Sequence, residues 1–207
     1  MPSVTRRAAR SPEHREAVIR QVAEAVERLL EDGRGYTTLG VQRIAEEAGI
    51  ARSTFYLYFP DKTALLMRVT ESATEELFAA AGSWLQEGFA DLAALEQTLQ
   101  GVIAQQREHA ALLAALTEVA GYDERVAQFW RRRVGGFVDL LRGRIADGQH
   151  AGTIAPALDP GTTAAWVAWG TERLVAQHVA ANPPDEDEHL AAGLARAIWT
   201  TLGRAVD

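Results

Sequence analysis

The fold is decided by residues Thr37–Lys62, which read TTLGVQRIAEEAGIARSTFYLYFPDK. Two short helical patterns, at about Val41–Ala48 and Ala51–Tyr56, flank an Ala-Gly turn, and this is the order of a helix-turn-helix. Gly49 permits the backbone angles that such a tight turn requires. The second helix has few apolar residues to bury and several hydrogen-bond donors to display. We therefore expect it to enter a major groove, read base edges and bond phosphates.

A longer helix precedes this pair. Ser11 and Pro12 predict its start, because Ser is a favoured N-cap and Pro is favoured at the first helical position. Gly33 and Gly35 predict its end. The three helices should share a small apolar core, whose members recur at helical spacing: Val18, Ile19, Val22, Val26, Leu29, Leu30, Ile44, Ala45, Ala48, Ile50 and Phe55.

Nearly all of the remaining chain also reads as helix, so the sequence predicts an all-α protein of about nine helices. Asp61, Asp91 and Asp159 are each placed to cap a helix, and Pro160 strengthens the last of these starts. We expect the helix after Asp61 to continue to Phe78. Glycines are expected to interrupt or end the later helices: Gly82 and Gly88 around Trp84, and Gly148 and Gly152 after a helix of about Asp123–Ala146.

The predicted domain boundary lies near residue 62. Residues 1–62 form an N-terminal arm and a helix-turn-helix domain, and residues 63–207 form a larger helical bundle. The formal net charge is −7 for 207 residues, but it is unevenly divided, since residues 1–62 carry +1 and residues 63–207 carry −8. Arg6, Arg7 and Arg10 precede any acidic residue, which is typical of an end that faces nucleic acid.

Several classes of protein are excluded by composition. The chain has no cysteine, so it has no disulfide framework, no thiolate nucleophile and no cysteine-ligated metal. It has no apolar run long enough to span a bilayer, and no apolar segment follows the first arginines as it would in a secretory signal. We expect a cytoplasmic protein with no cofactor, no metal and no membrane partner.

The helix-turn-helix region resembles the tetracycline-repressor (TetR) family of bacterial transcription regulators. The resemblance covers about 50 residues from Arg15 to Leu66. It is carried by the joined pattern Val41-x-x-Ile44-Ala45-x-x-Ala48-Gly49-Ile50, Thr54-x-Tyr56-x-Tyr58-Phe59, Asp61-Lys62 and Leu65-Leu66.

By this resemblance, Ala51–Tyr56 is the recognition helix and Lys62 is a phosphate contact. The residues that we expect to bind DNA are Thr38, Arg43, Arg52, Ser53, Thr54, Tyr56, Tyr58 and Lys62. Two alternatives stay open here: Arg43 lies on a solvated helix face, and Tyr58 and Phe59 pack inside the domain, which we favour for Phe59. The sequence departs from the family at Gly40 and Ala51, where a hydroxyl cap is usual, and both changes remove a cap and a phosphate contact.

The second part of the chain resembles the effector-binding domain of the same family, and more weakly its EthR-type members, whose long pocket accepts apolar ligands. The predicted effector-binding residues are Trp84, Trp130, Val134, Phe137, Trp169, Thr171, Glu172 and Trp199. For each apolar residue among them, the alternative is ordinary core packing. Glu172 either pairs with Arg173, faces solvent or polarises the pocket.

By analogy with the family, the last two helices, at about 160–180 and 186–204, form a dimer interface as a two-fold four-helix bundle. The expected interface residues are Trp166, Leu174, Val175, His178, Leu190, Leu194, Ala197, Ile198 and Thr201. The run Arg131-Arg132-Arg133 is expected to be a solvated helix face, with binding of an anionic ligand as the alternative.

Three hypotheses follow. The leading one is a homodimeric repressor that binds a palindromic operator and is released by a small apolar effector. The second is a helical enzyme, which the sequence disfavours because it contains no catalytic motif that we recognise; a metal at His178 and His189 is likewise explained more simply as solvated charge. The third is a carrier of apolar ligands that does not regulate DNA, for which the missing caps at Gly40 and Ala51 argue.

Overall fold

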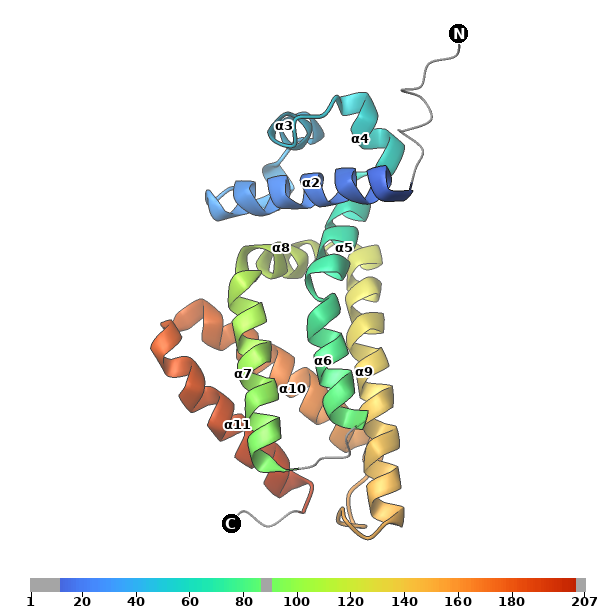
Figure 1. Cartoon of the computed structure of the whole chain (residues 1–207), viewed down its shortest axis with the longest axis vertical. Coiled ribbons are helices and arrows are strands. Elements are labelled where there is room, and N and C mark those ends of the chain that lie inside the picture. Colours follow the sequence, from blue (N-terminus) through green and yellow to red (C-terminus); the bar gives the residue numbers. More distant parts are fainter. Residues whose placement is uncertain (1–11, 87–90, 204–207) are drawn as a thin grey trace. The chain divides into compact units, whose positions relative to one another are not determined.

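The computed structural model describes residues 12–86 and 91–203, without the side chains at 12, 13, 80, 83, 84 and 86. Within these ranges the chain forms α-helices and two short 3-10 helices and no strand (Figure 1), which confirms the all-α prediction. Ser11, the arginines of the arm and Gly88 lie outside the described residues. The elements are α2 (Pro12–Glu31), η1 (Tyr36–Thr38), α3 (Val41–Glu47), α4 (Arg52–Tyr58), α5 (Lys62–Ala73), α6 (Glu75–Gln86), α7 (Leu92–Glu108), α8 (Ala110–Ala120), α9 (Glu124–His150), α10 (Pro160–Ala181), η2 (Pro184–Glu186) and α11 (Asp187–Thr201).

The chain divides into two compact units. The first takes the chain up to Ala73 together with Ala111–Ala127, and the second takes Thr74–Ala110 and the chain from Gln128 onward. The first unit therefore contains α8 in addition to the helix-turn-helix segment and α5. The assignment of DNA binding to residues 1–62 and of effector binding and dimerisation to residues 63–207 stays a prediction.

The first unit is built on α2, which packs against α3 and α5, while α3 packs against α4. The turn between α3 and α4 is formed as predicted, because Gly49 has a φ of +64°, in the left-handed region that favours glycine. Gln21 of α2 donates a hydrogen bond from Nε2 to the Ala48 carbonyl at 2.7 Å and so closes the end of α3. The buried side chains of the first unit include Val22, Val26, Leu29, Tyr36, Ile44, Phe55, Leu65, Leu66, Leu112 and Leu116.

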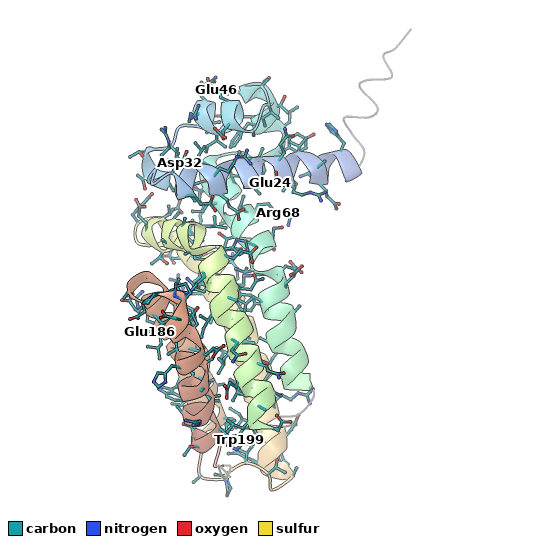
Figure 2. The ribbon with its side chains drawn as sticks, turned by 60° about the vertical axis from the view of Figure 1, so that its left-hand side comes forward. Glu24, Asp32, Glu46, Arg68, Glu186 and Trp199 are labelled. Carbon is teal, nitrogen blue, oxygen red and sulfur yellow. The ribbon has the colours of Figure 1, made fainter. Side chains whose placement is uncertain are left out.

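The second unit is organised around α7, which packs against α6, α10 and α11. Apolar residues at helical spacing on these helices and on α9 meet in one core. This core includes Leu85, Leu95, Leu99, Ile103, Leu141, Ile145, Ile154, Val175, Ile198 and Trp199. Figure 2 labels Trp199 on α11, near the C-terminal end of that helix.

The predicted helix caps are confirmed where the sequence offers an aspartate. The carboxylates of Asp61, Asp91 and Asp159 accept hydrogen bonds from the backbone N–H three residues ahead, at 2.7, 2.6 and 2.8 Å. These bonds satisfy N–H groups that have no partner within the helix. Gly40 and Ala51 are the N-caps of α3 and α4, and neither start has a side-chain cap.

Three expected boundaries were wrong. The helix after Asp61 stops at Ala73, and Thr74 separates it from α6. Thr74 is buried, and its hydroxyl accepts a hydrogen bond from Arg133 Nε at 2.7 Å. Gly82 lies inside α6, since a single glycine costs a helix only about 1 kcal/mol.

Gly148 also lies inside a helix, because α9 continues to His150. Its lack of a side chain serves packing instead. A Cβ built at Gly148 would lie 2.6 Å from Cδ1 of Ile154, and Ile154 belongs to the core of the second unit. The glycine therefore lets the segment after α9 fold back closely onto that helix.

This contact yields a prediction with a control in the same helix. Gly148→Ala should lower the free energy of unfolding by about 1–3 kcal/mol, because an added methyl overpacks the core. Gly143→Ala, where nothing lies within 4 Å of the added Cβ, should raise it by up to about 1 kcal/mol. Chemical denaturation measures both. Equal stabilisation by the two variants would contradict the close contact.

Candidate nucleic-acid interface

The helix α4 is anchored by its aromatic inner side. Phe55 is fully buried, and its ring lies 5.3 Å from that of the buried Phe59. The packing alternative for Phe59 is thereby confirmed. Since Phe55 fixes the rotation of α4 about its axis, the remaining side chains of this short helix are directed by the helical period alone.

The outer side of α4 carries two neighbouring rows of exposed residues. Arg52 and Tyr56 form one row, with the Arg52 guanidinium 5.7 Å from the centre of the Tyr56 ring. Ser53 and Leu57 form the other. The members of each row are four residues apart, so they lie on the same face of the helix. The outer surface of α4 therefore presents one cation, two hydroxyl groups and the apolar atoms of Leu57.

Leu57 is a candidate functional residue that the sequence analysis missed. Its exposed fraction is 78%, above that of any other large apolar side chain that the structure describes. A leucine usually indicates a core position, so the residue type alone does not predict an exposed functional side chain. The available signal was its position two residues after Phe55, because neighbours at this spacing lie on opposite sides of a helix.

Lys62 makes hydrogen bonds within the first unit, while its expected contact with a phosphate stays a prediction. Its ammonium group donates hydrogen bonds to the carbonyls of Tyr36, Thr37 and Leu39, at 3.2, 2.7 and 3.3 Å. These three bonds use all the donors of the ammonium. Burial lowers the pKa of Lys62, and the nearby carboxylate of Glu118 opposes that shift.

The sequence itself marks this position. Lys62 is the only lysine in the chain, and the other 20 of its 21 lysine and arginine residues are arginines. A single nitrogen with three donors can reach three carbonyls of one turn, whereas a planar guanidinium spreads its donors in a fixed fork. Tyr36 and Lys62 are joined by a second hydrogen bond, in which the Tyr36 hydroxyl donates to the Lys62 carbonyl. We call this set of bonds the Lys62 clamp.

The segment before α3 is further tied to α8 within the first unit. The Thr37 hydroxyl donates to the carboxylate of Glu118 and lies 2.9 Å from the Tyr122 hydroxyl. The start of α5 is held similarly, because Arg125 Nη1 lies 2.9 Å from an oxygen of Asp61. These bonds fix both ends of the α3–α4 segment.

Arg125 also holds Asp123, at 3.1 Å, and the Thr63 hydroxyl donates to the same carboxylate. The hydrogen bond from Arg125 is the largest cause of the lowered pKa of Asp123. For Asp61, burial acts to raise the pKa, but bonds from Arg125 and from the Ala64 N–H outweigh it and lower the pKa. Both carboxylates are therefore ionised at neutral pH.

The other predicted DNA-binding residues belong to η1, α3 and α4 and differ in exposure. Thr38 is exposed, and its hydroxyl donates to the Gly35 carbonyl at 2.9 Å. Arg43 is exposed but pairs with Glu47 at 3.1 Å, which favours the alternative of a solvated helix face. Thr54 and Tyr58 are half-buried.

The charge distribution favours α4 as the surface that meets phosphates. Its sequence, RSTFYLY, has no acidic residue. The carboxylate of Glu24 lies on α2, that of Asp32 directly follows the end of α2, and that of Glu46 lies on α3 (Figure 2). Because like charges repel, an approaching polyanion meets the least repulsion at α4.

The predicted effector residues fall in the second unit with differing exposure. Val134 and Trp199 are buried, and Phe137 packs against the core. Trp130, Trp169, Thr171 and Glu172 are half-buried. The side chain of Trp84 lies outside the described residues.

Glu172 is the polar member of this set. Its carboxylate accepts a hydrogen bond from Trp130 Nε1 at 3.3 Å. Burial raises the pKa of Glu172, while the bond from Trp130 and the charge of Arg173 oppose the shift. The bond from Trp130 and the partial burial distinguish Glu172 from a fully solvent-facing group, while a place in an effector pocket stays a prediction.

Arg133 differs from the expected solvated face. It is half-buried, its guanidinium lies 4.7 Å from the centre of the Phe78 ring, and it holds Thr74 as described above. Arg131 and Arg132 are exposed as expected. The long apolar stem of arginine can cover an aromatic ring while its head reaches a polar partner.

The predicted dimer residues divide into outward and inward groups. Trp166 and Leu174 are 53% and 46% exposed, and Ala197 is exposed. Leu190, Leu194 and Thr201 are half-buried. Val175, His178 and Ile198 are buried within the second unit itself.

His178 belongs to a polar network that joins three helices of the second unit. Its Nε2 lies 2.9 Å from Asp187, which Arg107 of α7 also binds at 2.6 Å. Hydrogen bonding to Arg107 is the largest cause of the lowered pKa of Asp187. Over the described ranges, no three histidine, aspartate or glutamate side chains are grouped so as to hold a metal ion.

No described helix is both long and apolar enough to cross a membrane.

The chain is similar to known proteins at two levels. Residues 22–69 match the family model described as "Bacterial regulatory proteins, tetR family". The nucleoid occlusion factor SlmA of Marinobacter nauticus is 28% identical over 156 residues, which are 74% of this chain and 75% of that protein.

Two solved structures share the fold. The regulator FadR from Bacillus subtilis, in complex with stearoyl-CoA, superposes with a TM-score of 0.73 at 18% identity, over 87% of this chain and 97% of FadR. AibR, in complex with isovaleryl coenzyme A and operator DNA, gives a TM-score of 0.65 at 20% identity, over 91% of this chain and 100% of AibR.

The Lys62 clamp leads to a prediction about stability. Lys62→Met should lower the free energy of unfolding by about 1–3 kcal/mol, the range for hydrogen bonds to a charged group. Lys62→Arg should also be destabilised, because the fork of the guanidinium does not match three carbonyls of one turn. Thermal melting followed by circular dichroism measures both.

The matched control is Arg68→Met, which removes a charge from the same helix at an exposed ion pair with Glu71. Its effect should stay within about 0.5 kcal/mol. If Lys62→Arg melts like the unaltered chain, charge alone accounts for the position and the clamp is refuted.

Proposed function

The chain belongs to the TetR family of bacterial regulatory proteins, and from this premise we propose that it is a ligand-responsive repressor of transcription. It binds a palindromic operator as a homodimer, and a small, apolar effector releases it. The observation that carries this proposal is the outer surface of α4, where Arg52, Ser53, Tyr56 and Leu57 face outward from a helix anchored by Phe55.

Each part of this surface has a matching part in DNA. The guanidinium of Arg52 suits a phosphate or a guanine edge, and the hydroxyls of Ser53 and Tyr56 suit phosphates or bases. Leu57 supplies apolar atoms for the methyl group of a thymine, which is an apolar feature of the major groove. Arg52 thus contributes to affinity for DNA, and Leu57 contributes to the selection of bases.

Two identical recognition helices are needed to read a palindrome, with half-sites about 34–36 Å apart. The exposed apolar side chains Trp166 and Leu174 on α10 and the exposed Ala197 on α11 support pairing of these helices with their copies. Leu190, Leu194 and Thr201 extend the proposed interface. Val175, His178 and Ile198 instead shape it from inside the protomer.

The effector part of the proposal rests on the second unit. We assign the half-buried Trp130, Phe137, Trp169 and Glu172 to the site of an apolar ligand, and the bond from Trp130 to Glu172 joins two of them. The complexes of FadR with stearoyl-CoA and of AibR with isovaleryl coenzyme A support this assignment, because proteins of the same fold take ligands with an apolar acyl part. Binding would favour a state in which the recognition helices no longer match the half-sites.

A carrier of apolar ligands that does not bind DNA is the second candidate. The helix starts at Gly40 and Ala51 favour it, because neither has a side-chain cap or a hydroxyl for phosphate. On either reading we assign no catalytic residue, and operator binding would place the protein in the cytoplasm.

Substitution of Arg52 separates these candidates. If Arg52 contacts a base edge, we expect Arg52→Ala to weaken binding to a duplex selected from a random pool by about 1–3 kcal/mol, which is roughly fivefold to 150-fold. If Arg52 meets a phosphate, the slope of log affinity against log salt should fall by about 1 instead. Fluorescence anisotropy at several salt concentrations measures both quantities.

Arg68→Ala provides the charge-matched control, since Arg68 lies in the same unit but on α5. It should leave affinity and salt slope nearly unchanged. A chain that selects no duplex, or that binds equally well after both substitutions, would reject the proposed repressor in favour of the carrier.

A further inference from the structure

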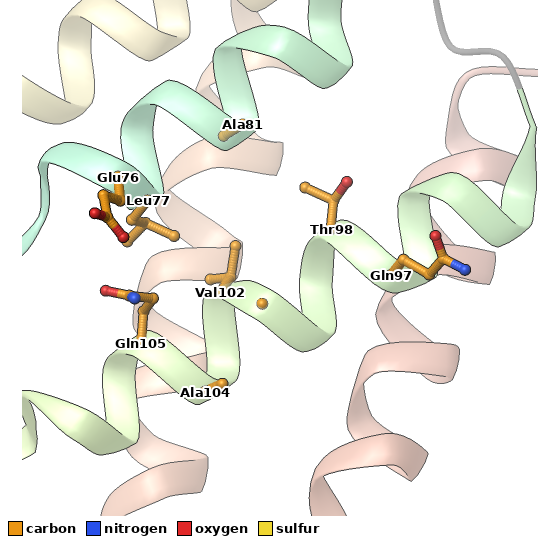
Figure 3. Close-up of a pocket in the computed structure, with 9 residues that line it drawn as sticks. Glu76, Leu77, Ala81, Gln97, Thr98, Val102, Ala104 and Gln105 are labelled. Atoms are coloured by element: carbon orange, nitrogen blue, oxygen red, sulfur yellow. The ribbon is translucent and has the colours of Figure 1, made fainter.

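A pocket of about 340 Å³ lies between α6 and α7 in the second unit (Figure 3). Of the predicted effector residues that the structure describes, none lines it. Its lining consists of Glu76, Leu77 and Ala81 from α6 and Gln97, Thr98, Gly101, Val102, Ala104 and Gln105 from α7. The volume is at the lower end of the range for small-molecule sites, about 300–1,000 Å³.

The inner surface of this pocket is apolar. Leu77, Ala81 and Val102 are half-buried side chains between the two helices. Gly101 adds no side chain, so the surface of α7 stays open beside Val102. The Thr98 hydroxyl donates to the Ala94 carbonyl at 2.9 Å and is thereby satisfied within its own helix. A ligand would therefore meet hydrocarbon over most of this surface.

The only charged group of the lining stands at one end of the pocket. Figure 3 shows the carboxylate of Glu76 on α6 and the amide of Gln105 on α7 facing one another across that end. Glu76 is the only charged residue in the lining, which holds no lysine, arginine or histidine. Among the described residues, no ion pair is formed by Glu76.

These features select one ligand chemistry. A carboxylate, phosphate or sulfate would meet the negative charge of Glu76 without a compensating cation, and like charges repel. A neutral apolar molecule would leave that carboxylate unused. An apolar cation would bury its hydrocarbon against Leu77, Ala81 and Val102 and place its charge beside the carboxylate.

We propose that the pocket between α6 and α7 binds a compact apolar cation, such as an alkylammonium, with Glu76 as its counter-ion and Gln105 as a hydrogen-bond acceptor. As an effector site this rests on the proposed regulatory function, whereas binding itself does not. The class differs from the acyl thioesters held by FadR and AibR, which are anionic through their coenzyme A.

The direct test is calorimetry of the full chain with three probes of six carbons each: hexylammonium, 1-hexanol and hexanoate. The cation should bind once per chain, more tightly than the alcohol, and hexanoate should bind most weakly. Glu76→Gln should weaken the cation on the order of fivefold, as expected for a partly exposed ion pair, and should leave the alcohol unchanged.

Two further variants sharpen the assignment. Glu75→Gln removes a charge from the same first turn of α6 but lies outside the lining, so binding of the cation should be unchanged. Ala81→Phe should abolish binding of the cation and of the alcohol by filling the pocket. Equal effects of Glu75→Gln and Glu76→Gln, or hexanoate as the tightest probe, would overturn the proposal.

Failure here is distinguishable from failure of the proposed function. If a selected duplex binds but hexylammonium does not, this pocket assignment is overturned while the repressor proposal stands. If the cation binds with the stated dependence on Glu76 and no duplex is selected, the pocket assignment stands and the repressor proposal falls.

Discussion

The first unit depends on one interaction, the three hydrogen bonds by which the Lys62 ammonium holds the carbonyls of Tyr36, Thr37 and Leu39. The carbonyls of Tyr36 and Thr37 belong to η1 and that of Leu39 to its C-cap, ahead of α3, while Lys62 begins α5, the next helix after α4. The clamp thus closes the loop of chain that contains both short helices. Helices of seven residues are not stable by themselves, so their geometry comes from this closure and from the buried Phe55.

A closed and anchored segment explains why α4 can display apolar and polar groups together. Phe55 and Phe59 supply its packing, so the two exposed rows of α4 do not need to contribute to the core. Leu57 is the clearest case, since 78% of it is exposed to solvent without a contribution to the core. A surface that is costly in water and placed beside Arg52 is understandable if a major groove covers it.

Much of the fold could be predicted from the sequence because its signals are local. The period of apolar residues and the aspartate caps at Asp61, Asp91 and Asp159 depend only on near neighbours. The clamp could not be predicted, because it joins residues about 25 positions apart through backbone carbonyls, which carry no residue identity. The place of Gly148 inside α9 could not be predicted for a similar reason, because its close contact with Ile154 exists only in the folded core. The pocket of Glu76 and Gln105 likewise exists only once α6 lies against α7.

The central claim is that the outer surface of α4 lies against DNA bases, and a site-specific cross-link tests it most directly. A photoreactive benzoylphenylalanine would replace Leu57 on α4 or, as a control, Leu140 on α9, which is 57% exposed. On irradiation with a selected, bound duplex, position 57 should cross-link to a base within the half-site and position 140 should not. A duplex that stays bound while position 57 gives no cross-link would contradict the claim.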